Sequence, residues 1–114
     1  MNDDFKDITK INQELNNISI NFKLFNLLKY FMIHSYDSEL IYLNRTLTLL
    51  KNLYNKEGKL SYIRFIDDLK NIFFPSENNF DNIPTNRKIN MLVELINSNK
   101  HYELYDKIIN TLQI

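Results

Sequence analysis

Apolar side chains recur three or four positions apart over most of this chain, which is the period of a helix with one buried face. The first such stretch is Asp4–Ile18, where most other positions are polar. Its apolar positions are Phe5, Ile8, Ile11, Leu15 and Ile18. The next stretch, Ile20–His34, is apolar on most sides, as is typical of a helix at the centre of a bundle. A polar pause around Asn16 and Asn17 leaves open whether these stretches form one helix or two.

The same period predicts four further helices downstream. Asp37 or Ser38 is a good N-cap for the third helix, which runs to about Tyr54. Gly58 follows it, where the end of a helix often needs a positive φ. The remaining helices are Lys59–Phe74, Arg87–Ser98 and His101–Gln113. An irregular segment separates the first two of them, and we expect Phe80 and Ile83 to hold this segment to the core. The fold class predicted is therefore all-α: a compact bundle of five to six short helices.

Length and composition support this interpretation. The chain has 114 residues, which suits one domain spanning residues 1–114. One glycine and two prolines are too few for the turns that a β-sandwich or barrel needs. The short connections favour neighbouring helices that run roughly antiparallel, whether death-fold-like or as another small bundle.

Charge and cysteine content exclude several classes of function. Fourteen basic residues balance fourteen acidic ones, so the chain lacks the basic excess of a nucleic-acid-binding protein. The absence of cysteine excludes disulfides and thiolate metal sites. Met1–Lys10 is acidic and polar, unlike a signal peptide. The most apolar stretch, Ile18–Ile33, is interrupted by polar residues and too short for a transmembrane segment, so we expect a cytoplasmic protein.

The chain offers little for catalysis. Its two histidines, His34 and His101, each lie at the edge of an expected helix, without the partners that a catalytic triad needs. Asp67 and Asp68 are adjacent carboxylates, but neighbours on a helix point about 100° apart, so a solvated face is the better interpretation. No phosphate-binding glycine loop occurs, and no pair of histidines lies four residues apart on one helix face, as in a helical metal site. We therefore expect no catalytic, cofactor-binding or metal site, and no enzyme activity.

The aromatic residues have two interpretations. Core packing is the stronger one for the phenylalanines, which lie on or beside apolar positions. The alternative is a pocket for an apolar ligand, lined by Phe25, Leu28, Phe65 and Phe73. The seven tyrosines are too many to be buried together, and tyrosine is favoured at protein interfaces.

Charged residues of the second half suggest an interface. Arg87 and Lys88 form a small basic spot that could contact an acidic partner, although such spots more often only aid solubility. The candidate interface residues are Arg64, Asp67, Asp68, Arg87, Lys88, Glu94, Tyr102 and Glu103.

The second half also carries an ordered set of apolar positions around an Ile–Pro entry into the penultimate helix. The set is Leu49, Leu50, Leu53, Tyr54, Ile63, Ile66, Leu69, Ile83, Pro84, Leu92, Val93, Leu104, Ile108 and Ile109. This order resembles that of the bacterial death-fold-like effector-associated domains, over about residues 47–112. The resemblance implies a non-catalytic adaptor that recruits partners by like-with-like contacts. Where that family often has glycine before the last helix, this chain has Asn97–Lys100.

These observations predict a non-catalytic protein–protein interaction module, namely an adaptor or regulatory domain in a bacterial conflict or signalling system. Its partner would be another protein, either a similar helical domain or a second copy of the chain in a homo-oligomer. The alternative is a small inhibitor or immunity protein, such as a bacteriocin immunity protein or a phage or viral antagonist, that binds one target.

Overall fold

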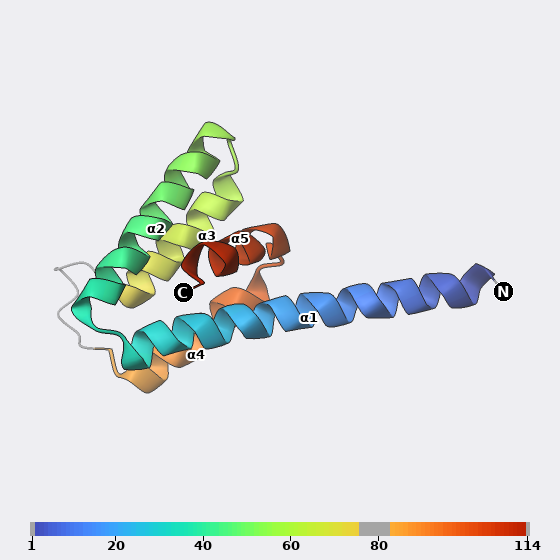
Figure 1. The fold of residues 1–114 in the computed structure, drawn as a ribbon, viewed down its shortest axis with the longest axis horizontal. Helices are drawn as coiled ribbons and strands as arrows, with labels where there is room; N and C mark the ends of the chain where they lie inside the picture. Colours follow the sequence, from blue (N-terminus) through green and yellow to red (C-terminus); the bar gives the residue numbers. More distant parts are fainter. Residues whose placement is uncertain (1, 76–82, 114) are drawn as a thin grey trace.

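The computed structural model describes residues 2–75 and 83–113, with side chains from Asp7 onward. Within these residues the chain forms five helices and no strand (Figure 1), which confirms the predicted all-α fold. The helices are α1 (Asn2–His34), α2 (Asp37–Lys56), α3 (Leu60–Phe73), α4 (Thr85–Ser98) and α5 (Tyr102–Leu112). Phe80, which was expected to hold the segment before α4 to the core, lies outside the described residues, and Ile83 is half-buried.

The first two predicted stretches join into one helix of 33 residues. The polar pause at Asn16 and Asn17 contains neither proline nor glycine, and asparagine costs less than about 1 kcal/mol per residue in a helix. Such a cost lowers the stability of the helix without interrupting it. At a rise of about 1.5 Å per residue, α1 is roughly 50 Å long.

The ends of α2 show one prediction that was wrong and one that was right. Tyr36, not Asp37 or Ser38, occupies the N-cap position, and its side chain makes no capping hydrogen bond. Asp37 and Glu39 lie instead in the first turn, where their charges favour the helix dipole. After α2, Gly58 has a φ of +70°, as predicted, and a Cβ there would meet no neighbouring atom. The backbone conformation alone therefore favours glycine at this position.

The core draws on all five helices. Both α4 and α5 pack against α1, α3 packs against α2 and α4, and α5 also contacts α2. Only the second half of α1 takes part, through the fully buried Leu24, Leu28 and Phe31. The first half projects past the other helices (Figure 1), and the molecule measures 59 × 34 × 26 Å. Its radius of gyration is 16.0 Å, against about 13 Å for a compact domain of this length.

Side chains close the turn between α4 and α5, where the family that the sequence resembles often has glycine. The Asn99 side-chain amide donates a hydrogen bond to the carbonyl of Leu95 (2.9 Å). The hydroxyl of the fully buried Tyr105 lies 2.7 Å from the carbonyl oxygen of Ile96 and 2.6 Å from that of Asn99. The last carbonyls of a helix lack partners within it, so these donors replace the missing bonds. Burial also raises the pKa of the Tyr105 hydroxyl, which stays protonated and able to donate.

His101 lies in the same turn, against the core aromatic residues. Its ring centroid is 5.0 Å from that of Tyr62 and 6.2 Å from that of Phe65. Burial lowers the pKa of this imidazole below its ordinary value, because the charged form loses its hydration.

We expect Tyr105→Phe to lower the free energy of unfolding by about 1–3 kcal/mol, since the carbonyls of Ile96 and Asn99 lose the one hydroxyl proton that they share. Chemical denaturation monitored by circular dichroism measures this change. Tyr36→Phe is the matched control, because Tyr36 is 77% exposed and should tolerate loss of its hydroxyl. Equal stability of the two variants would contradict the role assigned to Tyr105.

We expect His101 to make the protein less stable in mild acid. The pKa of His101 is lower in the folded state, so the unfolded chain binds the proton first and gains free energy as the pH falls through about 6.5. The free energy of unfolding should therefore fall between pH 7.5 and 5.5, and His101→Asn should make this fall smaller. Urea denaturation of both proteins at the two pH values measures the difference, and identical pH dependence would refute the prediction.

Candidate functional site

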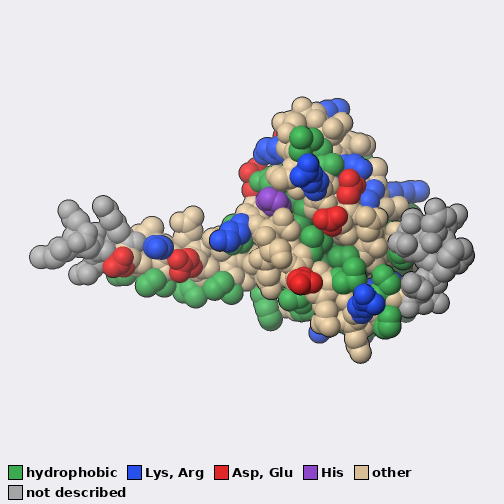
Figure 2. Space-filling view, turned by 180° about the vertical axis from the view of Figure 1, so that it is seen from behind, with side chains coloured by type: hydrophobic (Ala, Val, Ile, Leu, Met, Phe, Trp, Pro, Cys, Tyr) green, Lys and Arg blue, Asp and Glu red, His purple; other side chains and the backbone are tan. Residues whose placement is uncertain are grey.

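The most distinctive surface is an apolar row on the projecting half of α1. We call it the apolar stripe, and it consists of Ile8, Ile11, Leu15, Ile18 and Phe22. These side chains are between 54% and 64% exposed. Figure 2 shows hydrophobic side chains along one edge of the arm, continuing towards the body, with acidic and basic side chains beside them on the visible face. A row of large apolar side chains on one helix face marks a surface that binds something.

The stripe is exposed because the helix is longer than the body on which it packs. Every side chain from residue 7 to residue 16 is exposed, and the first fully buried side chain of α1 is Leu24. The sequence correctly identified an apolar face here. It could not show that this face remains uncovered, and none of the predicted interface residues belongs to it.

Covering the stripe would release a substantial free energy. Full burial of an isoleucine, leucine or phenylalanine side chain is worth about 1.5–3 kcal/mol. Each stripe residue still exposes more than half of its side chain, so covering all five would release roughly 5–9 kcal/mol. The entropy lost on association is about 4–15 kcal/mol. A partner with an apolar surface of its own would roughly double the gain and favour association.

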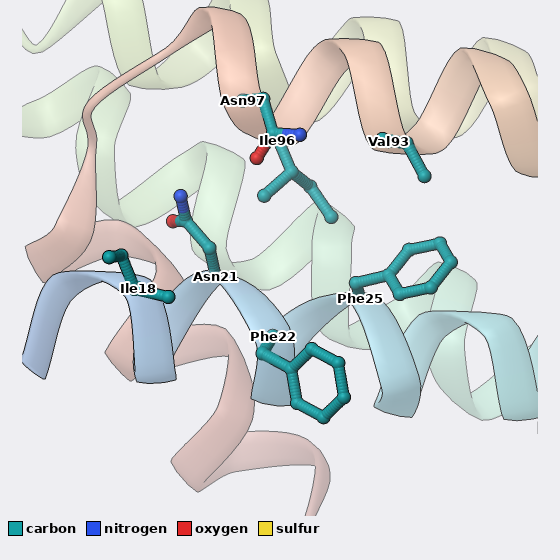
Figure 3. A pocket seen from close by; sticks show the side chains of 7 residues that line it. All are labelled: Ile18, Asn21, Phe22, Phe25, Val93, Ile96 and Asn97. Atoms are coloured by element: carbon teal, nitrogen blue, oxygen red, sulfur yellow. The ribbon is translucent and has the colours of Figure 1, made fainter. Parts of the chain in front are cut away.

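The stripe runs into a hollow between α1 and α4. This α1–α4 hollow has a volume of about 330 Å³. Its lining residues are Ile18, Asn21, Phe22, Phe25, Val93, Ile96 and Asn97. In Figure 3, Asn21 and Phe25 extend from α1 towards Ile96 and Val93 of α4. Because Ile18 and Phe22 belong to both features, the stripe and the hollow form one continuous surface.

The Asn21 amide gives this surface a polar group. Its Oδ1 atom is buried and accepts no hydrogen bond from the described part of the chain. A buried acceptor of this kind favours a partner that supplies an N–H or O–H donor.

The structure distributes the predicted ligand-pocket residues differently. Phe25 lines the α1–α4 hollow, whereas Leu28 and Phe65 are 0% and 1% exposed within the packed core. Phe73 packs against that core and is partly buried. The hollow beside Phe25 is therefore bounded by Val93, Ile96 and Asn97 of α4, which the sequence analysis did not place in a pocket.

Two of the predicted interface residues meet across a groove between α3 and α4. Asp68 and Glu94 line it together with Ile72, Met91 and Leu95, so carboxylates border an apolar floor. The three predicted basic residues lie on the same two helices. Arg64 is exposed on α3, Arg87 is exposed in the first turn of α4, and Lys88 beside it is half-buried.

The other predicted interface residues make contacts within the protein. Asp67 forms an ion pair with Lys51 at 2.7 Å, which connects α3 to α2. Glu103 approaches both Lys59 and the Tyr62 hydroxyl at 3.5 Å, which connects α5 to the start of α3. The Tyr102 ring is half-buried and packs edge-on against a neighbouring core tyrosine. These contacts hold helices together as well as presenting side chains to solvent.

Within the described residues, no three potential metal-ligating side chains lie close together. His34 packs its ring 5.6 Å from that of Tyr30 at the end of α1, and His101 lies in the turn before α5. None of the helices, over the part of the chain that the structure describes, is long and apolar enough to cross a bilayer.

Comparison of the chain with protein-family models, with curated proteins and with solved structures finds no match in any of the three. The similarity to death-fold-like domains therefore stays a prediction. The apolar stripe lies outside the residues to which that similarity applies.

Proposed function

We propose that this protein is a non-catalytic interaction module that binds a partner protein through the apolar stripe of α1. The observation that carries this proposal is the exposure of five large apolar side chains in one row, on a helix that projects past the rest of the described body. Functions that need only a packed body would not need this arm.

The shape of the surface favours a helical partner. The stripe is one side chain wide and follows a straight helix, so the partner that covers it best is another helix laid alongside. The α1–α4 hollow at its inner end would accept the side chains of such a helix. The partner helix also needs an apolar face, because burial of the stripe alone does not clearly exceed the entropy lost on association.

Both sequence-based hypotheses, the adaptor or regulatory domain and the inhibitor or immunity protein, are compatible with this surface. They differ in what happens to the partner. An adaptor leaves the partner active and brings it to a second protein, whereas an inhibitor abolishes the activity of its target. The setting in bacterial conflict or signalling systems stays a prediction from the resemblance.

Leu15→Lys tests the proposal, because it places a charge at the centre of the stripe at a position that is 58% exposed in the isolated protein. We expect this variant to remain folded and to lose at least about tenfold in affinity, since burying an unpaired ammonium costs more than 1.4 kcal/mol. Gln13→Lys is the matched control, because it adds the same charge at an exposed position of the same arm, off the stripe.

Affinity purification from the native cell, followed by mass spectrometry, compares the three proteins. We expect the wild type and Gln13→Lys to retain a common partner that Leu15→Lys loses. If all three retain the same proteins in equal amounts, the stripe is not the binding surface and the proposal fails.

A further inference from the structure

We infer that the partner helix is the α1 arm of a second copy of this chain, paired with the first in antiparallel orientation. This inference rests on the proposed function, because it names the occupant of the same stripe. Four features of the arm support it: its spacing, its register, its polar flanks and its position relative to the α1–α4 hollow.

The spacing of the stripe is that of a two-helix seam. From Ile8 the apolar positions advance by three, four, three and four residues to Phe22, and three more lead to Phe25. A strict alternation of three and four is the period with which paired helices interlock. A helix that lies on a broad protein surface shows a wider apolar face. The narrow seam therefore favours one helix as its occupant.

The seam is complementary to itself when two copies run antiparallel. In the best register, the numbers of each pair of facing residues add up to 33. Ile8 then faces the partner's Phe25, Ile11 faces the partner's Phe22, and Leu15 faces the partner's Ile18. The two-fold axis repeats these three layers, which gives six in all. The outermost two involve Phe25, which is half-buried and contributes only its side at the rim of the α1–α4 hollow. Sliding one arm by a full heptad removes two of the six, so this register buries the most apolar surface.

The side chains beside the seam permit the pairing. One flank carries Asn12 and Ser19, and the other carries Asp7, Glu14 and Asn21. In the same register Glu14 lies beside the partner's Asn21, which carries no charge. No carboxylate faces another carboxylate across the seam, and like-charge repulsion does not oppose the dimer.

The hollow explains why the antiparallel orientation is favoured over the parallel one. In the antiparallel pair, the Ile8 end of each arm reaches the partner's Phe25, next to the hollow that Val93 and Ile96 line. In a parallel pair, the Ile8 end of each arm would face only the partner's Ile8 end and would not reach the hollow. The seam from residue 8 to residue 25 spans only about 27 Å, which is short for a coiled coil, so contact with the hollow adds necessary area.

Sedimentation equilibrium over a wide concentration range tests whether the chain pairs with itself. We expect the wild type and Gln13→Lys to form dimers, and Leu15→Lys to raise the dissociation constant of the dimer at least about tenfold. Circular dichroism of each variant verifies that its helices are retained. A wild type that stays monomeric at every concentration would overturn the inference.

Cross-linking tests the orientation of the two arms. The chain has no native cysteine, so only the introduced thiols can react. Ile11→Cys and Phe22→Cys are prepared separately and treated with a short thiol-to-thiol cross-linker. In the antiparallel dimer, like positions lie about 16 Å apart along the axis, so neither variant alone should cross-link, whereas their mixture should. Cross-linking of each variant alone, without cross-linking between them, would show the parallel pair and refute the proposed orientation.

The two proposals fail in different ways. A monomeric wild type that still loses a cellular partner through Leu15→Lys would refute self-pairing and leave the proposed function intact. A dimer that is unaffected by Leu15→Lys would show that the chain associates through another surface, and would refute the role of the stripe in self-pairing.

Discussion

The architecture depends on one constraint: α1 is a continuous helix of which only the second half is anchored. Leu24, Leu28 and Phe31 fix its direction inside the core. No proline or glycine interrupts Asn2–His34, so nothing in the sequence allows a sharp kink. The first half must therefore continue along the axis that the core sets, past the edge of the body. The exposure of the stripe follows from this anchoring.

The body itself offers fewer free charges than its composition suggests. Lys51 pairs with Asp67, and Lys59 lies between Glu57 and Glu103. The Lys59 ammonium group also lies 5.6 Å from the ring centroid of Tyr54 and 5.2 Å from that of Tyr62. These contacts connect α2, α3 and α5 at the surface. Each exposed ion pair contributes little to stability.

The fold could be predicted because its information is local. The period of three to four residues located each helix, and the scarcity of glycine excluded sheets. The positive φ of Gly58 followed from its place after a helix. The start of α2 was placed too late, because residues that suit an N-cap equally suit the first turn, where Asp37 lies.

The interaction surface could not be predicted to the same degree, because exposure depends on what packs where. The sequence pattern of Ile8, Ile11 and Leu15 would be the same whether another helix buried these side chains or they were exposed to solvent. The charged residues chosen from the sequence looked available, but Asp67 and Glu103 have partners that only the tertiary structure brings near them. The strict alternation of three and four residues was the available signal. It becomes informative only once the length of α1 beyond the body is known.

The composition of the arm connects its helical structure to its binding. Asn12, Asn16 and Asn17 are weak helix formers, and the β-branched Ile8 and Ile11 add little. An isolated helix of this length and composition is marginally stable in water. A partner that covers the stripe therefore stabilises the helix as well as the complex, because it binds only the helical form. Because the arm has weak helix propensity and an exposed apolar seam, binding of its partner should stabilise its helical structure.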